Sequence, residues 1–197
     1  MPTIQRSYLQ KMINVIGTSD IKVITWVRRS WKSELLLAFK SYIENSITDY
    51  NIININFSDY KFRSIKTDDA LYKYVESNFI SNKKNFLLID EVQMCKWFED
   101  VINSFHNSKK YDIYITWSNA FLSSSDLATL FTWRTFEIPI LPFSFKEFLL
   151  YYKYSDLDIA FWEFIEKWWM AWSYQYETMS EKNDYINIEV SFYGMKD

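Results

Sequence analysis

Three groups of polar residues in this sequence are of types that bind phosphate, hold a divalent metal ion and activate water. Lys32 and Ser33 stand together at the start of a helical pattern, where an ammonium group can bind phosphate and a hydroxyl can bind Mg²⁺. Asp90 and Glu91 end one apolar run, and Asn119 follows another. A carboxylate is a hard oxygen ligand for Mg²⁺, and a second carboxylate beside it can polarise an attacking water. Each group alone is common, so their order along the chain carries the argument.

The residues before Lys32 form an altered phosphate-binding loop. Residues 21–33 have the sequence IKVITWVRRSWKS, which becomes the P-loop pattern G-x-x-x-x-G-K-S if Trp26 and Trp31 are replaced by glycine. In such a loop the backbone N–H groups surround the phosphates and the helix N-terminus adds its dipole. The residues expected to line the nucleotide are Trp26, Val27, Arg28, Arg29, Ser30, Trp31, Lys32 and Ser33. Tryptophan at the two glycine positions places an indole where the nucleotide should lie and adds a Cβ penalty of roughly 1–2 kcal/mol.

The amounts of glycine and tryptophan are both abnormal. The chain has 2 glycines in 197 residues, whereas glycine usually makes up about 7% of a protein. It also has 9 tryptophans. An α/β domain needs glycine in left-handed turns and phosphate loops, so the excess of one residue and the deficit of the other are expected to have one cause.

Composition limits the compartment and the partners. The single cysteine, Cys95, excludes an internal disulfide and fits a reducing compartment, so a cytoplasmic location is expected. The first residues, MPTIQRSYLQKM, lack an apolar signal core, and no apolar run approaches the roughly 18 residues of a membrane span. We therefore expect no membrane association. The net charge of −3 gives no electrostatic case for nucleic acid as a partner, although a local basic patch is not excluded by it.

The hydrophobic pattern predicts strands alternating with helices. Apolar, β-branched runs predict strands at 21–25, 51–57, 85–90, 112–116 and 135–140, the last with Pro139 at its end or at a sheet edge. Helices are predicted at 5–16, 33–47, 70–80, 97–106, 126–131, 142–152 and 158–167, and residues 58–66 are expected to be irregular. This alternation is typical of an α/β fold with a parallel sheet and helices on both faces. Ligands bind such sheets at the carboxyl ends of the strands, so Lys32, Asp90 and Asn119 should lie close together.

Several motifs occur in the order and spacing of a known family. The chain resembles a prokaryotic AAA-type ATPase family over roughly residues 4–175, through IKVITWVRRSWKS, FLLIDEVQ, ITWSNA, LFTWRTFEIPILPFSFKEF and KWWMAW. The resemblance implies an AAA-type P-loop NTPase fold, a three-layer sandwich around a central, mostly parallel five-stranded sheet. It also implies three parts: an N-terminal helical segment (1–20), the ATPase core (21–142), and a helical extension or truncated start of a C-terminal region (143–197).

The resemblance assigns roles to the polar residues and implies ATP and Mg²⁺ as cofactors. Lys32 and Ser33 match the Walker A residues, and Asp90 and Glu91 match the Walker B pair. Ser33 and Asp90 are then the metal ligands, Lys32 and Glu91 act on the phosphate and the water, and Asn119 is the polar sensor.

Arg134 has a less direct counterpart. It follows a family glycine, and it either senses the γ-phosphate or acts as a finger toward a neighbouring subunit of a homo-oligomer. Arg28 and Arg29 also match the family loop, where they either neutralise phosphate or simply carry surface charge.

Seven tryptophans stand where the family pattern has glycine. They are Trp26, Trp31, Trp117, Trp133, Trp168, Trp169 and Trp172. Our hypothesis is that UGA codons, which the source organism translates as glycine, have been written as tryptophan. These seven added to the two glycines present give nine in 197 residues, which approaches the usual level. Trp97 is expected to be a genuine tryptophan and Trp162 is unassigned; a decayed or altered gene is the alternative.

Two functions follow from these patterns. The first is an ATPase that hydrolyses ATP with Mg²⁺ and remodels an unidentified protein or nucleic-acid partner; the chain bearing tryptophan is expected to be inactive. The second is a non-hydrolysing interaction module with the same fold, in which Trp26 and Trp31 block the loop. The remaining conspicuous residues are expected to be structural. They are His106, Cys95, the acidic pair Asp156 and Asp158, and the aromatic stripe of Phe143, Phe145, Phe148, Tyr151 and Tyr152.

Overall fold

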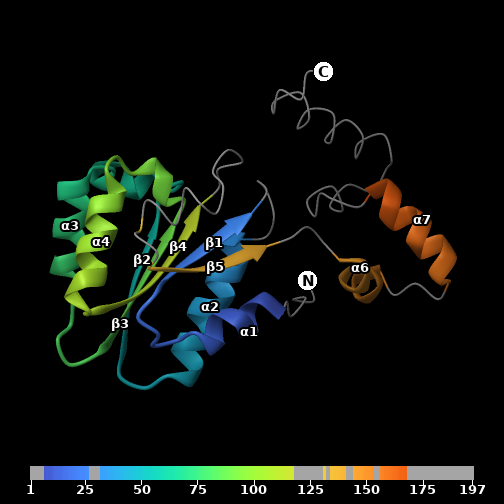
Figure 1. Cartoon of the computed structure of the whole chain (residues 1–197), viewed down its shortest axis with the longest axis horizontal. Coiled ribbons are helices and arrows are strands. Elements are labelled where there is room, and N and C mark those ends of the chain that lie inside the picture. Colours follow the sequence, from blue (N-terminus) through green and yellow to red (C-terminus); the bar gives the residue numbers. More distant parts are fainter. Residues whose placement is uncertain are drawn as a thin grey trace. The chain divides into compact units, whose positions relative to one another are not determined.

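The computed structural model describes residues 7–26, 32–117, 131, 134–140, 144–152 and 156–167. Two compact units contain these residues (Figure 1). Residues 5–28 and 32–140 belong to the unit with the sheet, and the helices beyond residue 141 belong to the other. No helix in the described part of the chain is both long and apolar enough to cross a membrane.

The first unit is built on a five-stranded sheet in which every neighbouring pair of strands is parallel. The strand order is β2-β3-β4-β1-β5. The strands are β1 (Ile21–Trp26), β2 (Tyr50–Asn56), β3 (Lys84–Asp90), β4 (Tyr111–Trp117) and β5 (Thr135–Ile140). Pro139 lies in the edge strand β5, where a missing N–H group is tolerated. The predicted parallel sheet and the place of the proline are confirmed.

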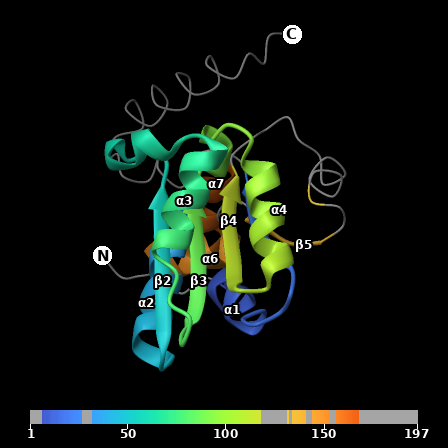
Figure 2. The same ribbon diagram turned by 90° about the vertical axis from the view of Figure 1, so that its left-hand side faces the viewer.

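Helices cover both faces of the sheet, as predicted (Figures 1 and 2). Helices α1 (Ser7–Asn14) and α2 (Lys32–Ser46) pack on one face, and α3 (Asp68–Ser77) and α4 (Phe98–Ser108) pack on the other. Successive side chains of a strand point to opposite faces. In β3, Phe86 and Leu88 therefore join the α1/α2 core, while Leu87 and Ile89 join the α3/α4 core. Burial on both faces explains the continuous apolar run of this strand.

Side-chain hydrogen bonds explain two of the places where the described structure differs from the predicted elements. The segment expected to be irregular contains a short 3₁₀ helix, η1 (Tyr60–Ile65), which begins where the Asp59 carboxylate accepts the Lys61 N–H at 3.0 Å. Helix α3 ends at Ser77 instead of residue 80. The Asn85 amide accepts the Ile80 N–H at 3.1 Å and donates to the Ile80 carbonyl at 2.8 Å, which holds this segment against β3 and out of the helix.

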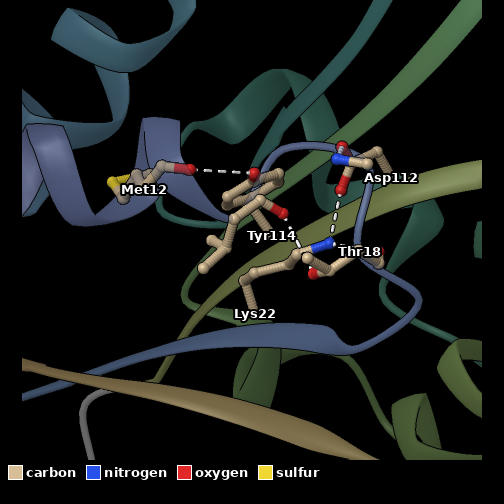
Figure 3. Close-up of polar contacts among 7 residues, drawn as sticks. Met12, Thr18, Lys22, Asp112 and Tyr114 are labelled. Carbon is tan, nitrogen blue, oxygen red and sulfur yellow. Dashed lines mark hydrogen bonds and ion pairs between the residues drawn. The ribbon is translucent and has the colours of Figure 1, made fainter.

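A buried polar cluster joins the amino ends of β1 and β4 (Figure 3). Lys22 is completely buried, and its ammonium donates to the Asp112 carboxylate and to the Thr18 carbonyl, each at 2.7 Å. The second Asp112 oxygen accepts the Gly17 N–H at 2.8 Å. The neighbouring Tyr114 hydroxyl donates to a carbonyl of α1 at 3.2 Å, and burial raises the pKa of this phenol. The cluster thereby fixes the turn between α1 and β1 against the sheet.

Asp112→Ala is expected to lower the free energy of unfolding by about 3 kcal/mol, because it leaves a buried ammonium without its carboxylate. Chemical denaturation would measure this loss. The matched control is Glu44→Ala, which removes the half-exposed pair Lys40–Glu44 within α2 and should cost under about 0.5 kcal/mol. Equal losses in the two variants would contradict a structural role for the cluster.

The described residues of the second unit form two helices, which pack through phenylalanines. They are α6 (Phe145–Tyr152) and α7 (Leu157–Lys167). The ring of Phe145 lies 5.4 Å from that of Phe161, and the ring of Phe148 lies 5.5 Å from that of Phe164. The predicted packing role of the aromatic stripe is confirmed for Phe145 and Phe148. The helix predicted at 126–131 lies outside the described residues, apart from the buried Phe131.

Candidate nucleotide site

The predicted strand–loop–helix unit is present at the carboxyl end of β1. The strand ends at Trp26 and α2 begins at Lys32, so five residues connect them. Those residues, 27–31, and the side chains of Lys32 and Ser33 lie outside the described part of the structure. The backbone N–H groups in the first turn of α2 have no partner within the helix and carry the positive end of its dipole. Such a helix start can bind an anion.

Asp90 lies at the same edge of the sheet, as predicted. It is the last residue of β3, and β4 alone separates β3 from β1. Only 3% of Asp90 is exposed, and its carboxylate accepts a hydrogen bond from the Thr116 hydroxyl at 2.5 Å. A buried carboxylate at this edge fits a hard cation such as Mg²⁺, which takes oxygen ligands.

Glu91 follows Asp90 in an unusual backbone conformation. Its φ of 58° and ψ of 50° are left-handed, a region that residues other than glycine occupy at a cost. Its N–H donates to the Thr116 hydroxyl at 2.9 Å, and its carboxylate accepts a bond from the Gln93 side-chain amide at 2.5 Å. Sequence reasoning did not select Thr116 or Gln93, although FLLIDEVQ and ITWSNA contain them.

The described residues do not bring Arg134 to this edge, which corrects one of its two expected roles. Arg134 precedes β5, and its carbonyl accepts the N–H of Ile21, the first residue of β1, at 2.8 Å. Its guanidinium donates to the Asn107 side chain at 2.7 Å. Arg134 therefore lies at the amino edge of the sheet, roughly 17 Å from the carboxyl edge across a six-residue strand. It cannot reach a γ-phosphate held by its own chain at that distance.

Trp117 shows how tryptophan fits one of the seven expected glycine positions. It ends β4 with 6% of its surface exposed, and its ring packs edge-on against Phe98 at 5.1 Å. The buried indole N–H has no hydrogen-bond partner among the described residues. An unpaired buried donor costs about 1–3 kcal/mol. Glycine would bring no such group, but it would also leave the space beside Phe98 unfilled, so the hypothesis that this tryptophan replaces glycine stays a prediction.

The other tryptophans give less information. Trp31, Trp133, Trp168, Trp169 and Trp172 lie outside the described residues, as does the predicted sensor Asn119. Trp162 is 68% exposed on α7. Trp97 is 69% exposed, with a left-handed φ of 60°, a conformation that glycine adopts at lower cost. Its expected identity as a genuine tryptophan stays a prediction.

A family model described as an AAA domain matches residues 18–149, two thirds of the chain. The chain belongs to this AAA domain family. The matched range contains every described strand of the sheet together with the positions of the candidate site, and it ends within α6.

Two curated relatives of this AAA domain are uncharacterised proteins. The first, from Haemophilus influenzae, is 39% identical over 147 residues, which cover 74% of this chain and 37% of the relative. The second, from Methanocaldococcus jannaschii, is 33% identical over 137 residues, which cover 70% of this chain and 30% of the relative. The chain thus spans about a third of the length of these relatives.

Solved structures share the fold of this AAA domain. Domain III of the Thermotoga maritima replication initiation protein DnaA has a TM-score of 0.51 and 17% identity, covering 84% of this chain and 71% of that one. Saccharomyces cerevisiae RIF2 has a TM-score of 0.53 and 12% identity, covering 85% and 70%. At such identities the likeness shows the fold alone. It agrees with the P-loop ATPase-like α/β fold and the parallel sheet described above.

Within the part of this AAA domain that the structure describes, no group of three or more metal-ligating side chains is present. Cys95 is buried, and desolvation, followed by the charges of Asp68 and Glu99, raises the pKa of its thiol to about 12. Such a thiol stays protonated and unreactive at neutral pH. The Nδ1 atom of His106 is buried and has no hydrogen-bond partner in the described part of the chain.

Proposed function

We propose that the natural protein, with glycine at the seven tryptophan positions, binds ATP with Mg²⁺ at the carboxyl edge of the sheet and hydrolyses it. One observation carries the proposal: Asp90 is buried at the end of β3, one strand away from the point where β1 leads into α2. Phosphate at the start of α2 and a metal ion beside Asp90 would therefore be neighbours. This is the arrangement that phosphoryl transfer requires.

Different residues would bind the phosphates and the metal ion. Lys32 would contact the β- and γ-phosphates and stabilise charge on the transferred group, while the amides of residues 26–31 would surround the phosphates. Asp90 and Ser33 would hold Mg²⁺. When bound, the ion would neutralise charge on the phosphate oxygens. A carboxylate and a hydroxyl are oxygen donors of the kind that Mg²⁺ prefers, so these residues fit the ion.

The hydrolytic step needs a base and a sensor. Glu91 would accept a proton from the attacking water, and the Gln93 amide would orient its carboxylate. Asn119, two residues after the end of β4, would orient the water or contact the γ-phosphate. Arg134 is left out of the site within one chain, because it lies at the amino edge. Its position still allows the other expected role, in which Arg134 acts as an arginine finger toward the nucleotide of a neighbouring subunit.

The cycle of ATP binding and hydrolysis would drive remodelling of a partner. The single cysteine fits a reducing compartment, so we place this activity in the cytoplasm. The partner would be a protein or a nucleic acid. The net charge of −3 gives no general electrostatic support for a nucleic acid. The alternative function is an interaction module that does not hydrolyse ATP. The tryptophans at 26 and 31 favour this alternative only if they are the natural residues.

The experiment is phosphate release by the chain with glycine at all seven positions, hereafter the seven-glycine chain. We expect turnover that needs Mg²⁺ and that falls at least about 100-fold when EDTA removes the metal, because charge on the phosphate oxygens is then no longer neutralised. Supplying Mg²⁺ in excess of the EDTA should restore the rate. Absence of Mg²⁺-dependent phosphate release from a folded seven-glycine chain would overturn hydrolysis and leave the interaction module.

A further inference from the structure

One hydroxyl connects the two acidic residues of the candidate site. Thr116 lies in β4, one residue before the strand ends, and is completely buried. Its Oγ1 donates to Oδ1 of Asp90 at 2.5 Å and accepts the N–H of Glu91 at 2.9 Å. A threonine hydroxyl has one proton to donate and lone pairs to accept with. Here the donor and an acceptor site are engaged by consecutive residues of the neighbouring strand end.

The two hydrogen bonds of Thr116 fix the geometry of two different groups. The bond to Asp90 fixes the plane of a carboxylate that would face the metal. The bond from the Glu91 amide fixes a left-handed backbone, with φ 58° and ψ 50°, that an L-residue adopts only at a cost. This backbone determines where the Glu91 carboxylate starts, and Gln93 holds its far end. Groups that orient metal ligands and bases in this way typically change metal affinity or activity by about 10–100-fold when removed.

We propose that Thr116 is a positioning residue for ATP hydrolysis, an inference that rests on the proposed function. Through one hydroxyl it orients the metal-binding carboxylate of Asp90 and the backbone that carries the base Glu91. It also couples both to β4, the strand that leads to Asn119. A displacement at the end of β4 would therefore reach the metal ligand and the base through a single pair of hydrogen bonds.

The test compares Thr116→Val and Thr116→Ser in the seven-glycine chain. Valine keeps the volume and removes the hydroxyl, whereas serine keeps the hydroxyl. For Thr116→Val we expect kcat to fall about 10–100-fold with KM for ATP changed less than about 3-fold. Thr116→Ser should stay within about 3-fold of the parent, because it retains both hydrogen bonds.

A binding measurement separates positioning from a general loss of stability. Calorimetric titration gives the affinity for ATP with and without Mg²⁺. The gain from Mg²⁺ should shrink about 10-fold in Thr116→Val and persist in Thr116→Ser. The matched control is Tyr114→Phe, which removes another buried hydroxyl from β4, the one bonded to Met12, and should leave kcat within about 2-fold. If Thr116→Val fails to fold, Thr116→Ala replaces it in the same assays.

Two results would overturn the inference, and they differ from each other. If the parent seven-glycine chain hydrolyses ATP and Thr116→Val matches it in kcat and in the Mg²⁺ gain, Thr116 has no positioning role. If the parent itself releases no phosphate, the proposed function fails, and the role of Thr116 fails with it.

Discussion

The seven-glycine chain should bind Mg²⁺-ATP about 100-fold more tightly than the chain as written. Trp26 is the last residue of β1 and its backbone is extended, so the cost expected there comes from the bulk of the indole and not from a left-handed φ. Indoles at positions 26 and 31 would occupy the space in which phosphate oxygens should meet backbone amides. A 100-fold change in affinity corresponds to about 2.8 kcal/mol, roughly the cost of losing one or two hydrogen bonds to a charged phosphate.

Calorimetric titration of both chains with Mg²⁺-ATP measures this difference. Restoring glycine at positions 26 and 31 alone should recover most of the affinity, since the other five tryptophans lie outside the loop. Lys32→Ala in the seven-glycine chain is the negative control. Equal, tight binding by both chains would contradict our interpretation of the loop. Absence of binding by the seven-glycine chain would contradict the ATP site itself.

Glu91→Gln in the seven-glycine chain should abolish hydrolysis while leaving ATP binding nearly intact. We expect kcat to fall about 100- to 10,000-fold, the range attributed to general base catalysis. Glutamine has the same shape and can keep a hydrogen bond with Gln93, which donates to a Glu91 carboxylate oxygen at 2.5 Å. ATP affinity should therefore change less than about 3-fold. Single-turnover phosphate release and a parallel binding titration separate the two quantities.

A matched substitution at the other edge of the sheet controls for the lost charge. Glu76→Gln removes a carboxylate that accepts bonds from Tyr111 at 2.7 Å and Lys110 at 3.3 Å. It lies on α3, away from Asp90, and should leave kcat within about 2-fold. If Glu91→Gln retained the parent rate, another group would have to be the base.

The strands and the buried helix faces could be predicted from sequence because their signals are local. Each described strand begins and ends within one residue of the predicted run, since a short apolar stretch marks each of them. The predicted position of Asp90 at the carboxyl edge followed from the same pattern, because a parallel sheet gathers its strand ends. That logic applied to Arg134 as well. A residue directly before the strand 135–140 must lie at the amino edge.

The contacts between strands could not be predicted in this way. The bond between Thr116 and Asp90 joins residues 26 apart, and the bond between Lys22 and Asp112 joins residues 90 apart. Both depend on the register of neighbouring strands, which hydrophobic periodicity does not specify. A lysine within the buried run IKVIT was nevertheless a usable signal, because a buried ammonium requires a carboxylate partner. The position at which α3 ends depends on hydrogen bonds from the Asn85 side chain. Helix propensity alone does not predict such a contact.

The coding DNA tests the central claim most directly. The claim is that the natural protein has glycine at the seven positions and therefore an intact phosphate-binding loop. Sequencing the gene should show TGA, read as UGA, at the codons for Trp26, Trp31, Trp117, Trp133, Trp168, Trp169 and Trp172, and TGG at the codon for Trp97. TGG codons at positions 26, 31, 117 and 133 would contradict the claim and make the blocked loop a property of the protein itself.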